Sequence, residues 1–283
     1  MKAAAIQMVS GTALDANLQS AKALLAQAAN EGAELAVLPE YFCLMGGKDI
    51  DKLAIQEPFG HGPIQSFLSQ TACSLNLWIV GGTLPLSIGN AAGGAATQEA
   101  TGSRVYNSCL AFAPDGQCVA RYDKMHLFKF DNGQEAFDEH RVLLRGNQPA
   151  HFDMTDRTGQ RWRIGMSVCY DLRFPELYRH YSQAGVDLLL VPSAFTYTTG
   201  QNHWELLLRA RAIENQAFVV APAQGGLHEN GRRTWGHSML IGPWGDILAQ
   251  QAVAAGVVCH ELVLAQRAQC HAKLPALSHR VIQ

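Results

Sequence analysis

The sequence predicts an α/β fold in which helices cover β-sheets, and two observations carry this prediction. Short apolar runs alternate with amphipathic helical segments near the N-terminus, and the same alternation returns after residue 160. A strand–helix–strand order of this kind is typical of layered α/β domains. No linker, composition shift or internal repeat divides the 283 residues. We therefore expect a single domain over residues 1–283, with a C-terminal arm of little pattern at about 266–283.

The N-terminal segments form a strand–helix–strand–helix–strand series. The helix expected at 15–30 has its apolar side chains at helical spacing, with Asp15 as its cap. The run at 35–38 is wholly apolar, which is typical of a strand covered on both faces. The other members are strands at 3–8 and 77–82 and a helix at 62–75. The Gly-, Ala- and Thr-rich segment at 88–102 predicts a mobile loop.

The rest of the chain combines strand pairs with renewed alternation. Pro114-Asp115-Gly116 separates two strand-like runs and predicts a hairpin. Residues 128–147 favour a loop with helical patches, and a second hairpin is expected around residues 242–245. The remaining expected elements are strands at 161–168, 187–191, 218–223 and 256–264, a helical segment near Pro175 and a helix at 204–215.

Composition narrows the class of function. The hydrophobic fraction of 48% and the charged fraction of 16% are ordinary for a soluble globular enzyme. A formal charge of -2 leaves no surplus of cations for nucleic acid. No apolar run reaches the ~20 residues that span a bilayer, and no signal peptide is evident. Seven scattered cysteines without a Cys-x-x-Cys pair fit a reducing cytosol. We therefore expect a cytoplasmic protein without nucleic-acid or membrane partners.

Cys169 differs from the other cysteines in its position between two elements. Apolar and polar residues alternate from 161 to 168 with the period of a half-buried strand, and Pro175 suits the first turn of a helix. A cysteine at such a corner has its sulfur at a sheet edge, near backbone N–H groups that favour the thiolate. This is a position for a nucleophile, although a lone cysteine is more often a core residue.

Glu40 and Lys124 also follow strand-like segments, and with Cys169 they supply the groups that hydrolysis of a carbon–nitrogen bond needs. A thiolate attacks the carbonyl or nitrile carbon, and a carboxylate moves the proton between thiol, leaving amine and water. A fixed cation stabilises the developing oxyanion. Carboxylate and ammonium side by side also keep each other charged when buried. This chemistry requires no metal or organic cofactor.

Three motifs contain these residues: LPEY at 38–41, YDKMHL at 122–127 and SVCYDLRFPE at 167–176. In this order and spacing they resemble the motifs of the nitrilase superfamily of carbon–nitrogen hydrolases, over about residues 3–264. The resemblance implies a four-layer α-β-β-α sandwich and a homodimer whose sheets stack through the interface, with higher homo-oligomers left open. It also implies roles for four residues: Glu40 as general base, Lys124 as oxyanion stabiliser, Cys169 as nucleophile and the backbone N–H of Tyr170 as second oxyanion donor.

The family resemblance also implies a second glutamate between the lysine and cysteine motifs, some residues before a glycine. Glu139, with Gly146 downstream, matches best and would orient Lys124 or the substrate. Glu135 is the competing candidate. A solvated loop carboxylate remains the alternative for both.

Downstream stretches at 192–195 and 203–216 resemble the Nit branch, which includes deaminated glutathione amidases and omega-amidases. Those at 223–226, 236–239 and 243–245 are closer to the former. The resemblance implies a thiol amidohydrolase that cleaves a small carboxylated amide through a thioester and releases ammonia. Omega-amidase activity on α-ketoglutaramate is the main alternative, followed by N-carbamoyl amidase and nitrilase activity.

Such a substrate carries carboxylates and an α-keto group, so cationic and hydroxyl groups should line its pocket. Arg173, which follows the nucleophile closely, is the candidate for holding a carboxylate, unless it only pairs with Glu176. The hydrogen-bonding candidates after the strand at 187–191 are Tyr197, Thr198 and Thr199. His203 ranks below Arg173, and the arginines of the following helix are interpreted as structural.

Three other classes of function stay open. A papain-like peptidase would pair a cysteine with a histidine, but the residues around Cys169 lack that context. The eleven histidines show no His-Glu-x-x-His or paired spacing that would predict a metal site. A non-catalytic binding scaffold is disfavoured because all three catalytic positions hold competent residues.

Overall fold

The computed structural model describes residues 1–88, 104–133 and 136–282. The N-terminal half contains β1 (Lys2–Gln7), α1 (Leu14–Asn30), β2 (Leu35–Val37), the 3-10 helix η1 (Asp49–Ile55), α2 (Pro63–Leu75), β3 (Trp78–Val80), β4 (Leu84–Leu86), β5 (Val105–Phe112), β6 (Cys118–Asp123), β7 (Lys129–Asp131), β8 (Ala136–Asp138), η2 (Glu139–Arg141) and β9 (Leu143–Leu144). The expected loop at 88–102 lies outside the described residues except for residue 88, and so does Glu135.

The C-terminal half continues the alternation of strands and helices. It contains β10 (Ala150–Thr155), β11 (Arg161–Met166), η3 (Cys169–Arg173), α3 (Pro175–Gln183), β12 (Leu188–Leu190), α4 (Tyr197–Asn215), β13 (Phe218–Ala221), β14 (Gly225–Leu227), β15 (Arg233–Trp235), β16 (Met239–Ile241), β17 (Ile247–Gln250), β18 (Gly256–Glu261) and α5 (Leu264–Lys273).

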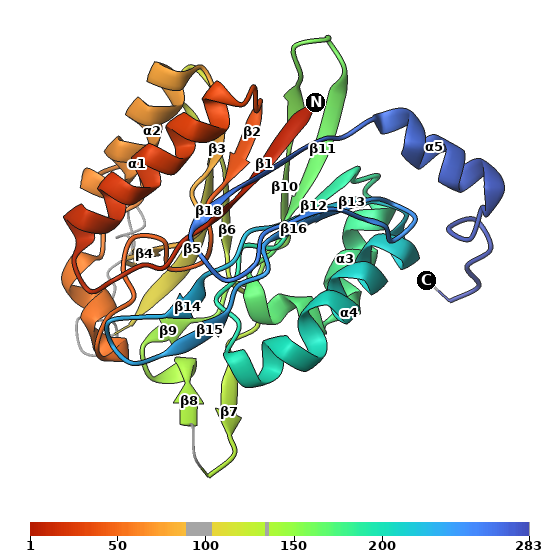
Figure 1. The fold of residues 1–283 in the computed structure, drawn as a ribbon. Coiled ribbons are helices and arrows are strands. Elements are labelled where there is room, and N and C mark those ends of the chain that lie inside the picture. The colour runs from red at the N-terminus through yellow and green to blue at the C-terminus, as the bar shows by residue number, and fades with distance from the viewer. Residues whose placement is uncertain (89–103, 134–135, 283) are drawn as a thin grey trace, which may run out of the picture.

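These elements form two sheets that pack face to face between two layers of helices, as the sequence predicted (Figure 1). One sheet has the order β18-β1-β2-β3-β5-β4, and β6 and β9 also pair with β5. The other has the order β10-β11-β12-β13-β16-β17. Helices α1 and α2 cover the first sheet and α3 and α4 cover the second. The fold is therefore an α-β-β-α sandwich.

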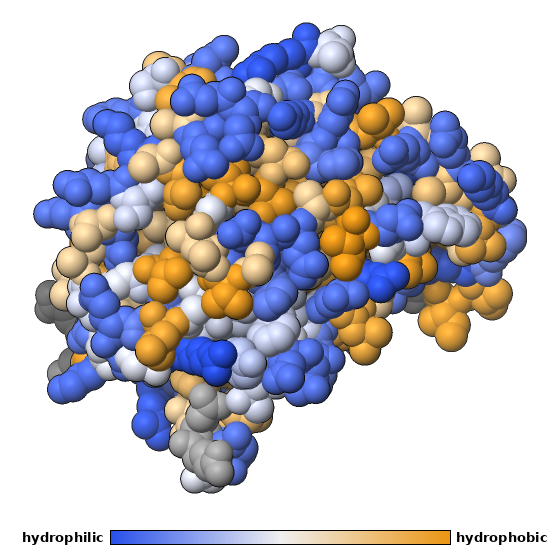
Figure 2. Space-filling model, viewed as in Figure 1, coloured by the Kyte–Doolittle hydropathy of each residue, from blue (hydrophilic) through white to orange (hydrophobic). Residues whose placement is uncertain are grey.

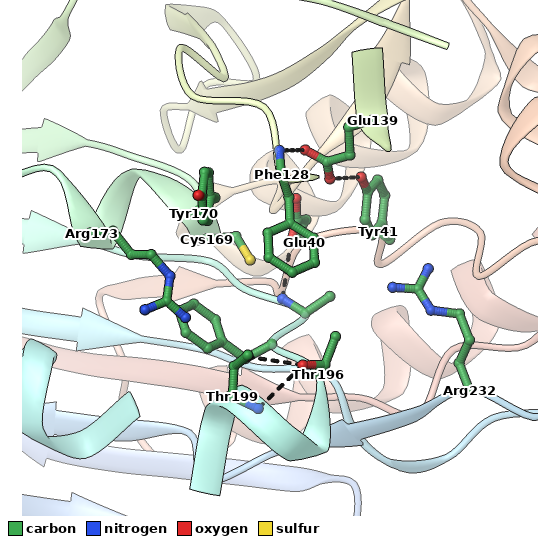
Figure 3. A pocket seen from close by; sticks show the side chains of 12 residues that line it. Glu40, Tyr41, Phe128, Glu139, Cys169, Tyr170, Arg173, Thr196, Thr199 and Arg232 are labelled. Carbon is green, nitrogen blue, oxygen red and sulfur yellow. Dashed lines mark hydrogen bonds between the residues drawn. The ribbon is translucent and has the colours of Figure 1, made fainter. Parts of the chain in front are cut away.

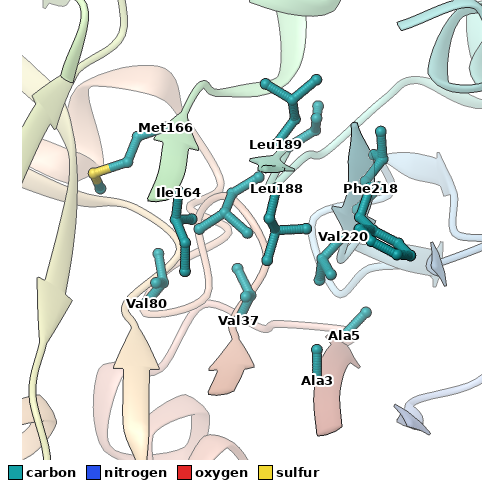
Figure 4. Close-up of a cluster of buried hydrophobic side chains, with 14 of the residues drawn as sticks. Ala3, Ala5, Val37, Val80, Ile164, Met166, Leu188, Leu189, Phe218 and Val220 are labelled. Atoms are coloured by element: carbon teal, nitrogen blue, oxygen red, sulfur yellow. The ribbon is translucent and has the colours of Figure 1, made fainter. Parts of the chain in front are cut away.

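The central strands alternate between two apolar layers. In β1, Ala3 and Ala5 face the core between the sheets, whereas Ala4 and Ile6 face the layer beneath α1 and α2. Figure 4 shows side chains of β1, β2 and β3 opposite those of β11, β12 and β13 in the core between the sheets. Because both faces of these strands are buried, their sequences are almost wholly apolar. Burial at about 25 cal/mol per Å² of apolar surface makes this core the main source of stability.

The parallel strands of both sheets determine where the site forms. β1, β2 and β3 run parallel in the first sheet, and β11, β12 and β13 run parallel in the second. Ligands of open α/β sheets bind beyond the carboxyl ends of such strands. The segments that follow β2, β11 and β12 contain Glu40, Cys169 and Ala194. All three line one pocket.

Helix α4 begins at Tyr197, seven residues before the expected start at residue 204. Thr196 caps it, since its side chain accepts a hydrogen bond from the backbone N–H of Thr199. Gly200 obscures this start because glycine disfavours helices. A Cβ atom at Gly200 would lie 2.3 Å from the Cβ of Trp235, so the close approach of β15 explains this glycine.

Other expectations about local structure were wrong. Helix α1 has Ala13 as its N-cap with no side-chain capping bond, so Asp15 is not the cap but lies in the first turn, where its charge suits the helix dipole. Residues 128–147 contain three short strands besides η2, not only a loop with helical patches. The strands β4, β10, β14 and β15 were not anticipated. β4, β14 and β15 have three residues each, which is too short to show a period, whereas β10 has six and was simply missed.

The C-terminal arm contains helix α5, which the sequence pattern did not reveal. Its docking is mostly polar. Arg267 pairs with Asp187 at 3.1 Å and donates to the backbone O of Gln216, and His271 contacts the Gln216 side chain. The helix has few large apolar side chains and buries only Cys270, so its sequence gives little apolar signal. No helix in the described part of the chain has the length and apolarity needed to span a membrane.

Candidate active site

One pocket of about 360 Å³, measured to its open mouth, lies where segments from both sheets meet. Figure 3 shows that Cys169 and Glu40 lie at its centre, with Arg173 and Arg232 on opposite sides. The pocket is lined by Glu40, Tyr41, Phe128, Glu139, Cys169, Tyr170, Arg173, Ala194, Phe195, Thr196, Thr199 and Arg232. Lys124 lies behind this lining and is fully buried.

Glu40 is a buried carboxylate with a hydrogen bond to each oxygen. Its Oε1 accepts from the Nδ2 of Asn107 at 2.9 Å and from the Nζ of Lys124 at 2.9 Å. Its Oε2 accepts from the backbone N–H of Ala194, 3.0 Å away, which follows β12 of the other sheet. The carboxylate is therefore fixed in one orientation at the junction of the two sheets.

Lys124 lies between two carboxylates. Its Nζ is 2.9 Å from the Oε1 of Glu40 and 2.9 Å from the oxygens of Glu139. Burial by itself lowers the pKa of the ammonium, but the negative charges of Glu139 and Glu40 outweigh burial, and the pKa is raised well above its usual value. Lys124 is therefore a permanent cation at neutral pH.

Glu139, one of the two candidates for the second glutamate, contacts Lys124 in the structure. Its Oε1 accepts from the hydroxyl of Tyr41 at 2.8 Å, and its Oε2 accepts from the backbone N–H of Phe128 at 2.7 Å. Burial is the largest single influence and raises the pKa of Glu139, but the charge of Lys124 and the hydrogen bonds from Lys124, Phe128 and Tyr41 together lower it by more. Burial, followed by the charges of Glu139 and Glu40, raises the pKa of Tyr41, which stays a neutral donor.

Cys169 begins η3 with a φ of 51°, a left-handed conformation that is rare outside glycine. Its backbone N–H donates to the carbonyl O of Pro192 at 3.0 Å, which ties the turn to the end of β12. Burial, and then the charge of Glu40, raises the pKa of the Cys169 thiol well above its usual value, although Lys124 acts against this. The resting group is therefore a thiol.

Asp171 braces the turn that carries Cys169. Its side chain is fully buried and accepts hydrogen bonds from the backbone N–H of Val168 at 2.8 Å and the hydroxyl of Tyr122 at 2.7 Å. Its other oxygen is 3.0 Å from the backbone N and 2.7 Å from the ring Nδ1 of His126. Because Tyr122 and His126 flank Lys124, one carboxylate connects the cysteine segment to the lysine segment.

The backbone N–H of Tyr170 lies in the first turn of η3, where N–H groups have no partner within the helix. Its neighbours are occupied, since the N–H of Cys169 donates to Pro192 and that of Asp171 donates to Val168. The Tyr170 ring lines the pocket. No hydrogen bond of this N–H is recorded among the described residues, and its role as an oxyanion donor stays a prediction.

The structure separates the substrate-binding candidates. Arg173 and Thr199 line the pocket, whereas Tyr197 and Thr198 are not part of that lining. Tyr197, Thr198 and Thr199 form the first turn of α4. Because a helix has 3.6 residues per turn, their side chains point to different faces. Tyr197 instead packs edge-on against Trp235, with Arg233 over its ring at 3.7 Å. The alternative for Arg173, a pair with Glu176, is not among the ion pairs of the described residues.

Sequence reasoning missed several residues of the pocket wall. Tyr41 and Phe128 follow Glu40 and Lys124 closely in the motifs, and their closeness in sequence was the available signal. Arg232 precedes the short strand β15, which was not anticipated. Asn107 lies within β5, outside the predicted loops and the three motifs, so no sequence pattern singled it out. Within the described ranges, no group of three or more His, Cys, Asp or Glu side chains is arranged to hold a metal ion.

Comparisons with known proteins agree with this geometry. A family model described as carbon-nitrogen hydrolase matches residues 2–272. Deaminated glutathione amidase of Synechocystis sp. is 40% identical over 99% of this chain and 97% of its own length. Omega-amidase NIT2 of Homo sapiens is 32% identical over 98% of this chain and 94% of its own.

Solved structures show the same architecture. The C. elegans NitFhit protein superposes with a TM-score of 0.83 at 32% identity, and the match covers 99% of this chain but only 65% of that one. Saccharomyces cerevisiae Nit3, described as a member of branch 10 of the nitrilase superfamily, gives a TM-score of 0.83 at 27% identity, over 97% of this chain and 94% of its own.

Proposed function

Because the chain belongs to the carbon–nitrogen hydrolase family, we propose that it cleaves a small carboxylated amide through a thioester on Cys169. It is a hydrolase of linear amides. The observation that carries the proposal is the buried Lys124, held 2.9 Å from both Glu40 and Glu139 behind the cysteine pocket. Such a cation beside a thiol and a carboxylate supplies the three groups of cysteine-dependent amide hydrolysis.

The first step transfers the thiol proton of Cys169 to Glu40. The raised pKa of the thiol means that a preformed thiolate is scarce at neutral pH, so a general base is required. As the sulfur attacks the amide carbon, the carbonyl oxygen becomes an oxyanion. Lys124 and the backbone N–H of Tyr170 stabilise it, and removing one such donor costs about 2.7–4 kcal/mol of transition-state stabilisation.

In the second half of the reaction Glu40 acts first as an acid and then again as a base. Glu40 gives its proton to the leaving nitrogen, the carbon–nitrogen bond breaks and the acyl group remains on the sulfur as a thioester. Glu40 then takes a proton from water, the hydroxide adds to the thioester, and the acid leaves as Cys169 regains its proton. Glu139 keeps Lys124 charged and in place throughout, because it bonds the ammonium and is itself fixed by Tyr41 and Phe128.

We propose deaminated glutathione as the substrate, since the relative with 40% identity bears that name. Omega-amidase activity on α-ketoglutaramate is the second candidate, supported by the relative with 32% identity. The leaving group distinguishes them. α-Ketoglutaramate is a primary amide and releases ammonia. The γ-amide of deaminated glutathione is secondary and releases a dipeptide amine together with 2-oxoglutarate, so the expectation of ammonia release is wrong for this substrate.

The test measures 2-oxoglutarate from both substrates, with the wild-type chain and with Cys169→Ala as the blank. Faster turnover of deaminated glutathione supports the proposal, and preference for α-ketoglutaramate moves the assignment to an omega-amidase. A simple nitrile and an N-carbamoyl amino acid, followed by ammonia release, cover the remaining alternatives. Turnover that persists in Cys169→Ala would exclude the mechanism.

We also propose a homodimer of single-domain subunits, each using residues 1–283 as one unit, in the cytoplasm. The exposed face of α4 carries Leu206 and Ile213, 69% and 50% exposed, and Trp244 lies nearby at 51%. Figure 2 shows apolar patches interrupting the polar surface on the side of α4 and α5. The seven cysteines are all free thiols, which suits a reducing compartment. Leu206→Glu should produce monomers in sedimentation, and an unchanged sedimentation coefficient would contradict this interface.

A further inference from the structure

The two arginines of the pocket pair with no carboxylate in the described part of the chain. Within the described residues, neither Arg173 nor Arg232 forms an ion pair, although both line the pocket. Among the described residues seven other arginines pair with Asp or Glu and six do not, so what sets Arg173 and Arg232 apart is that they line the pocket without such a pair. An unpaired guanidinium in a pocket is a ready partner for an anionic ligand.

The contacts of these arginines orient the guanidinium groups without neutralising them. Arg173 lies over the rings of Tyr170 at 5.8 Å and Phe195 at 5.6 Å, and its Nη1 is 3.2 Å from the Nδ1 of His203. Arg232 lies over the ring of Phe137, 5.1 Å from its centre. Cation–π contacts restrict the arginine side chain and leave its N–H donors available at the edge of the plane.

The carboxylates around Cys169 already have hydrogen-bond partners other than the two arginines. Glu40 and Glu139 both face Lys124 and are hydrogen-bonded to it. This cluster has one more negative than positive charge, but its carboxylate oxygens already accept from Asn107, Ala194 and other fixed donors. Among the described residues, the two arginines make no bond to this cluster. Their N–H donors are therefore available to a molecule that binds in the pocket.

The two arginines lie on opposite sides of the nucleophile. Figure 3 shows Arg173 on one side of Cys169 and Glu40, and Arg232 on the other side beyond Tyr41. Arg173 is the last residue of η3, the short element that begins at Cys169, so the backbones of the two residues are held close together. Arg232 comes from the separate loop between β14 and β15.

We propose that the substrate carries one carboxylate in each half of the amide: Arg173 binds that of the acyl half, and Arg232 binds that of the leaving amine. The inference rests on the proposed amide hydrolysis, because the scissile carbon must lie at Cys169 between the arginines. It makes Arg232 the residue that selects secondary amides with an acidic amine. A primary amide leaves Arg232 without a partner.

The test compares two ligands that differ by one charge: deaminated glutathione and the same molecule with its glycine carboxylate converted to an amide. Their dissociation constants are measured by calorimetry with Cys169→Ala, which prevents turnover. The amidated ligand should bind this protein roughly ten- to a hundredfold more weakly, as expected for loss of a charged hydrogen bond. With Arg232→Met added, the difference should fall to about twofold or less.

Three further variants sharpen the comparison. Arg173→Met should weaken both ligands alike and leave the difference between them intact. Arg232→Lys keeps the charge without the planar fork and should recover part of the difference. Arg233→Met is the matched control, because Arg233 is an exposed neighbour that packs on Tyr197 outside the pocket and should change neither constant.

A difference that survives Arg232→Met, or that is absent before this substitution, would overturn the proposal. The same measurements distinguish a failure of the proposed hydrolysis from a failure of the two-arginine inference. Wild-type turnover of both ligands at equal dissociation constants would refute the two-arginine inference alone. Selective binding of the dicarboxylate without any wild-type turnover would refute the proposed hydrolysis alone.

Discussion

Substitution of Lys124 by methionine tests catalysis and stability together. Methionine approximates the volume of the lysine stem and removes the ammonium. The side chain of Lys124 is fully buried, and Glu40 and Glu139 are 1% and 15% exposed. The substitution therefore leaves two carboxylates close together with no cation between them, and it removes one of the two donors assigned to the oxyanion.

The structure gives a magnitude for each effect. Loss of one oxyanion donor lowers kcat by about 10²–10³-fold. Removal of one partner from a buried ion pair destabilises a protein by about 3–5 kcal/mol, because the remaining charge loses its compensation. Asn107, Ala194 and Phe128 still donate to the carboxylates, so we expect the lower end of that range.

The pH dependence follows from the directions of the pKa shifts. The pKa of Glu139 is lowered in the folded chain, so its contribution is present above the unfolded value and is lost as pH falls through the folded pKa. The pKa of Lys124 is raised, so its contribution is present below the unfolded value and is lost as pH rises through the folded pKa. The stability gap between wild type and Lys124→Met should be widest between about pH 5 and pH 10 and narrow in acid.

Urea unfolding at several pH values measures the gap, and steady-state hydrolysis measures kcat. Lys129→Met is the matched control, because Lys129 is 72% exposed and only 3.9 Å from Asp138. It should change stability by no more than about 0.5 kcal/mol and leave kcat unchanged. Equal stability of Lys124→Met and wild type across this pH range, or normal kcat in the variant, would refute the reasoning.

Three other substitutions test the remaining parts of the site. Cys169→Ser should reduce turnover by several orders of magnitude with an unchanged circular dichroism spectrum, and normal kinetics would exclude Cys169 as the nucleophile. Glu139→Gln should lower kcat and destabilise the fold by about 1–3 kcal/mol in urea unfolding, since Lys124 loses a charged partner. A kcat and a free energy of unfolding equal to those of the wild type would show that Glu139 has no role in the site. Asp171→Asn should lower the melting temperature and reduce kcat more than it changes KM, because the amide nitrogen replaces an oxygen that has two hydrogen-bond contacts. A pure KM effect would contradict the bracing role.

The sequence predicted the parts of the site that follow strands within short motifs. Glu40, Lys124 and Cys169 each come within a few residues of a strand end, so a correct topology brings them together without further information. Glu139 was harder, because β7, β8 and η2 are too short to show a pattern. Gly146 helped, since a Cβ there would lie 2.1 Å from the carbonyl O of Asp123, beside Lys124.

The pocket wall could not be predicted in the same way. Whether Thr199 or its neighbours face the pocket depends on the start of α4, and one turn of helix redistributes three consecutive side chains. Arg232 enters from a short hairpin whose position depends on long-range contacts. His228 in that loop shows this, since its ring lies 2.9 Å from the carbonyl O of Ser10 and 2.7 Å from the hydroxyl of Thr234.

The candidate site depends on the two sheets being packed together, because neither sheet alone supplies all of the proposed catalytic residues. Glu40 follows a strand of the first sheet but accepts from Ala194 of the second, and Gln224 donates to its backbone carbonyl from the second as well. Tyr41 and Cys169 have φ values of 57° and 51°, in a region that costs about 1–3 kcal/mol for residues other than glycine. Strain of this kind persists only where surrounding contacts over-determine the backbone, so the buried core between the sheets holds the reactive geometry as well as the fold.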